Sequence, residues 1–131
     1  MSRLAELIAQ REGFGISGAL PTRNDNPGDL MHAPGEMHPA DAPNSIGSFT
    51  DAAAGWAALE TQLQRYAARG LTLAEMICGT PDSNGQLQGG YAPAPQNDAV
   101  GYVHFLCDGL PATSDMLVVD ALKIPGRTPN V

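Results

Sequence analysis

The chain has 131 residues and a formal charge of −7, with a pI near 4.6, which fits one compact domain and leaves no room for two. Its seven basic residues are scattered singly, which argues against both a nucleic-acid partner and a cationic membrane-surface helix. There is no apolar run of membrane-spanning length and no export signal at the N-terminus, so we expect no membrane partner and synthesis in the cytoplasm without a signal peptide.

The first predicted element is a short amphipathic helix over residues 3–12. It has a serine N-cap, an apolar stripe and a glycine stop, at Ser2, Leu4, Leu7, Ile8 and Gly13. Prolines recur between residues 14 and 50 and exclude a long helix there. We expect this segment to be irregular, with short strands near 29–32 and 45–50 that form a small β-hairpin after the first helix.

The longest predicted helix opens at Thr50 and Asp51 and runs to about Arg69. Its large apolar residues recur at heptad-like spacing and predict the central core helix: Trp56, Leu59, Leu63 and Tyr66. Next, Thr72 and Glu75 form a capping box that opens a short helix.

The last third of the chain begins with a loop over 79–96 rich in Gly, Pro, Asn and Gln. A helix over 97–108 is then expected to bury Val100, Val103 and Leu106. The final predicted helix has Thr113 or Ser114 as its cap and precedes Pro125. These elements predict a single, mainly α domain over residues 1–124, with a central long helix among shorter ones, and a flexible tail over 125–131. The spacing of Cys78 and Cys107 leaves open whether they form a disulfide.

One acidic residue stands out at the end of the first helix. Leu4, Ile8 and Glu12 are four residues apart, so they stack along one helix face and Glu12 continues the buried line. Partial burial and the negative end of the helix dipole both disfavour the carboxylate. We therefore predict a raised pKa for Glu12, as a general acid needs, although a solvated helix end is the alternative reading.

Several motifs in order carry a resemblance to a known family. "EGFG" at 12–15, "RNDNPGDL" at 23–30, "GSFTDAAAGWAAL" at 47–59, "GLTLAEMI" at 70–77 and "YAPAPQNDAVGYV" at 91–103 resemble the signature of phage peptidoglycan-degrading domains of the lysozyme superfamily. The resemblance covers roughly residues 4–110. It departs from the family where aspartates, Asp25 and Asp29, replace asparagines, and where the segments at 39–44 and 79–90 are longer.

This resemblance implies an α+β lysozyme-like fold and cleavage of peptidoglycan glycan strands, with Glu12 as the general acid/base. Matching residues by motif implies substrate contacts at Asn26, Phe49, Thr50, Tyr91, Asn97 and Tyr102. For Phe49 and Tyr102 a core position is favoured over a substrate contact, because aromatic residues are few and the core needs volume, whereas Asn26 reads equally well as a residue that closes its own turn. Tyr91, in a Gly- and Pro-rich loop, is the better candidate for stacking on a sugar. The expected partner is the glycan strand, and the resemblance implies no cofactor.

The reaction has two possible outcomes. An inverting hydrolase needs a second carboxylate about 6.5–9.5 Å from the acid to activate water. Asp25 and Asp29 are the leading candidates, and Glu36 and Asp41 lie in the same loop segment. A lytic transglycosylase needs one acid/base, because the muramyl 6-hydroxyl is the nucleophile. As no second carboxylate is distinguished by the sequence, transglycosylation is slightly favoured.

Two other function classes compete with this interpretation. His32, Glu36 and His38 could ligate a cation, but the prolines place them on a loop and their spacing matches no helical metal motif, so we expect no metal site. The more serious alternative is a catalytically inactive lysozyme-like domain that is a structural or cell-wall-binding component of a virion. The acidic pI suits a domain carried in a virion or delivered by partner proteins to the cell wall or periplasm.

Overall fold

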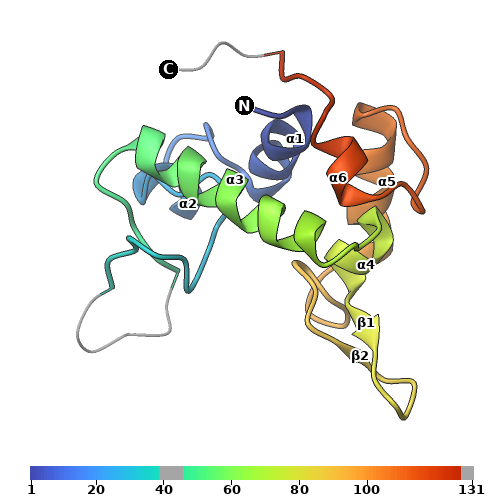
Figure 1. Ribbon diagram of the computed structural model, residues 1–131. Coiled ribbons are helices and arrows are strands. Elements are labelled where there is room, and N and C mark those ends of the chain that lie inside the picture. The colour runs from blue at the N-terminus through green and yellow to red at the C-terminus, as the bar shows by residue number, and fades with distance from the viewer. Residues whose placement is uncertain (39–45, 128–131) are drawn as a thin grey trace.

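The computed structural model describes residues 1–38 and 46–127. Helices dominate, and one two-stranded antiparallel sheet is present in this part of the chain (Figure 1), which confirms the mainly α prediction. The elements in chain order are α1 (Arg3–Glu12), α2 (Leu20–Arg23), α3 (Ala52–Ala68), α4 (Leu73–Cys78), β1 (Thr80–Pro81), β2 (Leu87–Gln88), α5 (Ala99–Gly109) and α6 (Val118–Ala121).

Helix α1 forms where it was predicted. The Ser2 hydroxyl accepts a hydrogen bond from the Ala5 amide at 3.2 Å, and Gly13 ends the helix with a left-handed φ of 94°. The Ser2 amide and hydroxyl also donate to the Glu60 carboxylate at 2.7 and 2.8 Å, which ties the start of α1 to α3. The helix therefore has a fixed position relative to α3.

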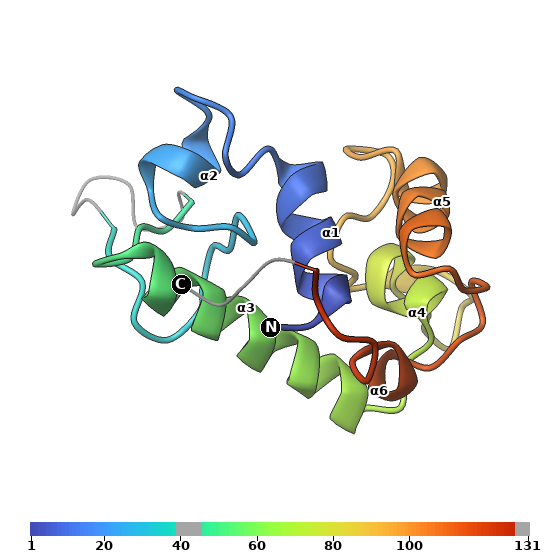
Figure 2. The same cartoon turned by 90° about the horizontal axis from the view of Figure 1, so that it is seen from above.

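The core lies where α1, α3, α4, α5 and α6 meet. Figure 2 shows α1 between the segment that carries α2 on one side and the α4–α5 pair on the other. Leu59 and Leu63 of α3 are fully buried, as the heptad-like spacing predicts. Trp56 is half-buried and packs edge-on against Phe14, with ring centroids 5.4 Å apart, so its role is structural. The capping box of Thr72 and Glu75 is also confirmed.

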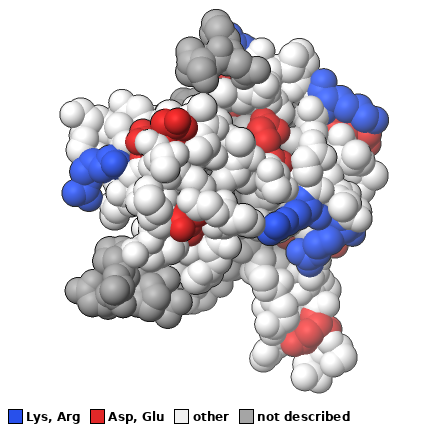
Figure 3. Space-filling model, turned by 60° about the vertical axis from the view of Figure 1, so that its left-hand side comes forward, with Lys and Arg blue, Asp and Glu red and all other residues white. Residues whose placement is uncertain are grey.

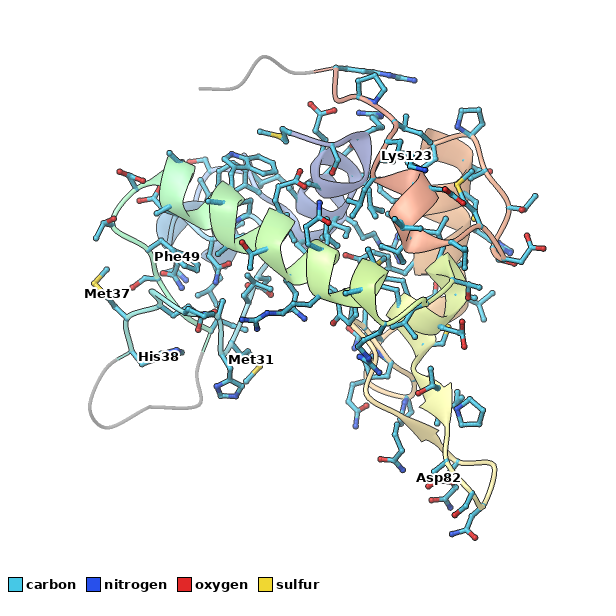
Figure 4. The ribbon with its side chains drawn as sticks, viewed as in Figure 1. Met31, Met37, His38, Phe49, Asp82 and Lys123 are labelled. Atoms are coloured by element: carbon cyan, nitrogen blue, oxygen red, sulfur yellow. The ribbon has the colours of Figure 1, made fainter. Side chains whose placement is uncertain are left out.

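The predicted β-hairpin after α1 is wrong for the residues that the structure describes. That segment holds the short α2 and one isolated bridge, between Met37 and Ser48, whereas the strands pair farther along, as Thr80 with Gln88 and Pro81 with Leu87. The reason is local turn chemistry. The Asp82 carboxylate, at the tip of the projecting hairpin in Figure 4, accepts hydrogen bonds from the Asn84 and Gln86 amides at 2.8 and 3.0 Å.

Two details of the last third also differ from the prediction. Helix α5 begins at Ala99, two residues later than predicted, and Val100 is 65% exposed, because the buried stripe of α5 runs through Tyr102, Val103 and Leu106 and Val100 lies off it. Helix α6 begins at Val118 with Leu117 as its N-cap and no side-chain cap hydrogen bond, so neither predicted cap residue is used.

The start of the expected tail is held in place. Pro125 forms an isolated antiparallel bridge with Ser2, and the Arg127 amide donates to the Glu6 carboxylate at 2.7 Å. Residues 125–127 therefore contact the start of α1, and the rest of the predicted tail, residues 128–131, lies outside the described part of the chain. Cys78 and Cys107 are both free, half-buried thiols. In the described ranges no helix is both long and apolar enough to cross a membrane.

Candidate functional site

Glu12 lies at the C-terminal end of α1, on the face that the sequence predicts. Leu4 and Ile8 on the same face are fully buried, and Glu12 is half-buried. The hydroxyl of Tyr102, a buried residue of α5, donates a hydrogen bond to Glu12 Oε2 at 2.8 Å. The carboxylate is thus oriented by a residue 90 positions away in the chain, and α1 and α5 together position it.

The surroundings of Glu12 raise its pKa above the ordinary value of 4.5. Burial is the largest cause, as predicted from the helix face, and the nearby charge of Asp29 adds to it. The hydrogen bond from Tyr102 and the charge of Arg11 act in the opposite direction but do not cancel the increase. Burial, together with the Glu12 charge, raises the pKa of Tyr102 as well, so its hydroxyl stays protonated and remains a donor.

Asp29 is the second carboxylate of this site. Burial raises its pKa, and its Oδ1 is buried with no hydrogen-bond partner among the described residues. Its φ of 52° is left-handed, a conformation that Asp tolerates better than most residues. Asp25 has the same unusual φ, at 51°, but is not among the groups that act on the pKa of Glu12. Asp41, the fourth candidate, lies outside the described residues.

Asn26 holds the loop that carries Asp29. Its side chain is completely buried and makes three hydrogen bonds, donating to the carbonyls of Leu30 and Gly47 at 2.9 and 2.8 Å and accepting from the Leu30 amide at 3.0 Å. No polar atom of this side chain remains for a ligand. The structure therefore gives Asn26 a structural role, the alternative that its turn-forming chemistry also allows, while a substrate contact there stays a prediction.

Tyr91 links the loop to the aromatic side chains behind it. Its hydroxyl donates to the carbonyl of Gly28, and its ring centroid lies 6.3 Å from that of Tyr66 and 6.4 Å from that of Tyr102. A Cβ on Gly28 would stand 2.8 Å from the Tyr91 hydroxyl, so only glycine allows this approach. The row of three tyrosines connects α3 to the Glu12 carboxylate.

Two adjoining hollows lie along α3. The first, here called the tyrosine hollow, has a volume of about 450 Å³ and is lined by residues 28–33, by Gln62, Arg65 and Tyr66 of α3, and by Gly90 and Tyr91. The second, the alanine hollow, has a volume of about 400 Å³ and is lined by residues 33–35, by Phe49 and Thr50, and by α3 from Ala54 to Arg65. Because Ala33, Gln62 and Arg65 line both, the two hollows adjoin.

The predicted site residues are only partly brought together. Glu12, Asp29, Tyr91 and Tyr102 form one connected group, although Glu12 lines neither hollow and reaches the tyrosine hollow only through its neighbours. Phe49 is buried beneath the first half of α3 (Figure 4), with the exposed Thr50 beside it at the alanine hollow.

Asn97 stands apart from this group. It is exposed and donates to the Pro93 carbonyl at 3.2 Å, so the structure gives it a loop contact and no link to Glu12. Gln62 and Arg65 were missed by the sequence analysis. Their spacing of three residues places both on one face of α3, beside the buried stripe of Leu59 and Leu63, and could have indicated them.

The histidines of the loop contact Glu36 and each other. His38 Nε2 lies 2.8 Å from Glu36 Oε2, and the rings of His32 and His38 stack with centroids 6.4 Å apart. Among the described residues, no group of three or more His, Cys, Asp or Glu side chains could hold a metal ion.

The charges of the surface follow the composition. On the face shown in Figure 3, basic side chains fall in separate small groups, with acidic ones between them.

Comparisons of this chain with protein-family models, with curated protein sequences and with solved structures find no match.

Proposed function

We propose that this chain cleaves the glycan strands of peptidoglycan, with Glu12 as the general acid/base. The observation that carries the proposal is a half-buried carboxyl with a raised pKa, held by a tyrosine hydroxyl and placed near a second desolvated carboxyl. Desolvation of this kind is how glycoside-cleaving enzymes keep an acid protonated near neutral pH. The ordered motifs of the sequence support the same reading.

Cleavage of the glycan strand requires Glu12 first in its protonated form and, for transglycosylation, then in its ionised form. In its protonated form it gives a proton to the oxygen of the scissile bond while the sugar develops oxocarbenium character. In transglycosylation its ionised form then takes the proton of the muramyl 6-hydroxyl, which closes the anhydro ring. The Tyr102 hydroxyl suits both steps, because a neutral donor at 2.8 Å orients the carboxyl and stabilises its charged form once the proton has left.

Asp29 bears on which product is formed. The sequence favours transglycosylation only because it distinguishes no second carboxylate, whereas in the structure Asp29 is set apart from Asp25 by its charge effect on Glu12 and by an unpartnered buried oxygen. A carboxylate in that position can take a proton from water, as inverting hydrolysis requires. We therefore propose hydrolysis through Asp29 beside transglycosylation through Glu12 alone, and the product decides between them.

The wider setting is part of the same proposal. A long helix among shorter ones, with the acid at the end of the first helix, is compatible with a lysozyme-like arrangement. We propose a phage-encoded domain that acts on the cell wall or periplasm. The net charge of −7 argues against electrostatic steering toward an anionic wall, so delivery in a virion or by a partner protein suits it better.

The test is digestion of purified sacculi by the wild type and by Asp29→Asn, with mass analysis of the released muropeptides. Products ending in anhydromuramic acid that both proteins release indicate a lytic transglycosylase. Reducing ends that depend on Asp29 indicate a hydrolase. A folded wild type that releases nothing from several wall types overturns the enzymatic proposal and leaves the structural or wall-binding component as its replacement.

A further inference from the structure

Arg65 has an unusual position among the basic residues of this chain. It is the one Lys or Arg among the described residues that lines either hollow, and it lines both. Three others have partners within the fold: Arg3 pairs with Glu6, Lys123 pairs with Asp120, and Arg11 lies over the Tyr102 and Phe105 rings.

The Arg65 guanidinium is not used by the fold itself. It is exposed, and no hydrogen bond or ion pair joins it to another described residue. A guanidinium at the junction of two hollows, whose five donors have no partner within residues 1–38 and 46–127, is suited to bind a carboxylate through two parallel hydrogen bonds.

The charged residues that line the two hollows indicate where an anionic group of a ligand can lie. Asp29 lines this hollow but not the alanine hollow, and in its ionised form it repels an anion. Arg65 is shared by both hollows and attracts one. A ligand with a neutral ring and a carboxylate arm would therefore place the ring toward Asp29 and Tyr91 and the arm toward Arg65.

We propose that Arg65 binds a carboxylate carried on the 3-O-lactyl arm of muramic acid, and so selects muramic-acid-containing strands over neutral glycans. The inference rests on the proposed function. The carboxylate can be that of the lactyl group itself or one of the peptide stem attached to it, and both share the same chemistry. On this view Arg65 sets the register of the strand without taking part in bond cleavage.

Cleavage kinetics on three substrates test whether Arg65 binds this carboxylate. The first substrate is intact sacculi, and the second is strands freed of peptide by an amidase, which exposes the lactyl carboxylate. The third is the same stripped strands after carbodiimide coupling to methylamine, which makes the lactyl group neutral. The variants are Arg65→Gln, Arg65→Lys and, as a matched control, Arg69→Gln, an exposed arginine one turn along that lines neither hollow.

We expect Arg65→Gln to lower kcat/KM about three- to tenfold, mainly through KM, on substrates that carry the recognised carboxylate, with no loss on the neutral strands. A loss on sacculi alone assigns the peptide stem, and a loss on stripped strands assigns the lactyl group. Arg65→Lys should retain part of the wild-type kcat/KM on these substrates, and Arg69→Gln should retain all of it. Equal rates for Arg65→Gln and the wild type on every substrate would overturn the inference.

Cosedimentation with sacculi measures binding without cleavage when Glu12→Gln is present in each protein that is compared. Melting curves check that each protein is folded. If the wild type cleaves nothing but binding still weakens specifically with Arg65→Gln, the enzymatic proposal fails and the carboxylate site stands. If the wild type cleaves and Arg65→Gln alters neither binding nor rate, the carboxylate site fails and the enzymatic proposal stands.

Discussion

Gly55 of α3 offers a sharp test of how the loop that carries Asp29 is placed. In an exposed helix interior, replacing Gly by Ala stabilises a protein by about 1 kcal/mol. Here a Cβ on residue 55 would stand 2.0 Å from the Asp25 carbonyl oxygen and 2.8 Å from the Pro27 ring. The first distance is about 1.4 Å short of the ordinary contact of 3.4 Å. The neighbour is backbone, so it cannot turn aside as a side chain could.

We therefore expect Gly55→Ala to lower the free energy of unfolding by about 2–4 kcal/mol, which corresponds to a fall of about 5–15 °C in the melting temperature. Because the displaced segment leads directly to Asp29, activity on sacculi should fall further than the loss of folded protein explains. The matched control is Ala57→Gly, an exposed position two residues along, which should cost no more than about 1 kcal/mol. Thermal melts followed by circular dichroism measure both, and a higher melting temperature for Gly55→Ala would refute this packing.

Three further predictions concern the site. Asp29→Asn removes a like charge and should lower the pKa of Glu12, whereas Tyr102→Phe removes a hydrogen bond to the carboxylate and should raise that pKa. Titration of the Glu12 carboxyl by NMR measures both shifts. Shifts of the same sign in the two variants would contradict the account. Because folding raises the pKa of Glu12 above 4.5, the ionised carboxylate costs stability above that pH. Glu12→Gln should accordingly raise the melting temperature at pH 7, with the gain vanishing as the pH falls to about 4; a gain that grows toward low pH would show the opposite sign. Asn26→Ala leaves buried backbone groups without partners and should cost about 2–4 kcal/mol in urea unfolding, while a cost below about 0.5 kcal/mol would mean that water replaces the side chain.

Much of the helical framework could be predicted from the sequence, because its signals are local. The Ser2 cap, the Gly13 stop and the capping box of Thr72 and Glu75 are each contained within a few residues, and all are present in the structure. The partial burial of Glu12 could be predicted for the same reason, since it follows from the helical repeat and from two buried neighbours, Leu4 and Ile8.

The rest depends on contacts that no local pattern encodes. The Tyr102 hydroxyl reaches Glu12 across 90 positions, and the Tyr91 hydroxyl reaches Gly28 across 63. Whether a polar loop residue faces a ligand or the fold is also a tertiary matter, as the complete burial of Asn26 illustrates. The misplaced hairpin has a different cause: the turn that Asp82 closes with the Asn84 and Gln86 amides lies in a segment whose Gly- and Pro-rich composition predicts an irregular loop.

The most direct test of the central claim is the rate at which purified sacculi release muropeptides with the wild type, with Glu12→Gln and with Asp108→Asn. Asp108 is an exposed carboxylate of α5, so its variant matches the change in charge without touching the site. The account predicts that Glu12→Gln loses release by a hundredfold or more, on the order expected for a general acid, while it stays folded and Asp108→Asn keeps the wild-type rate. Release by a folded Glu12→Gln at the wild-type rate would contradict the account.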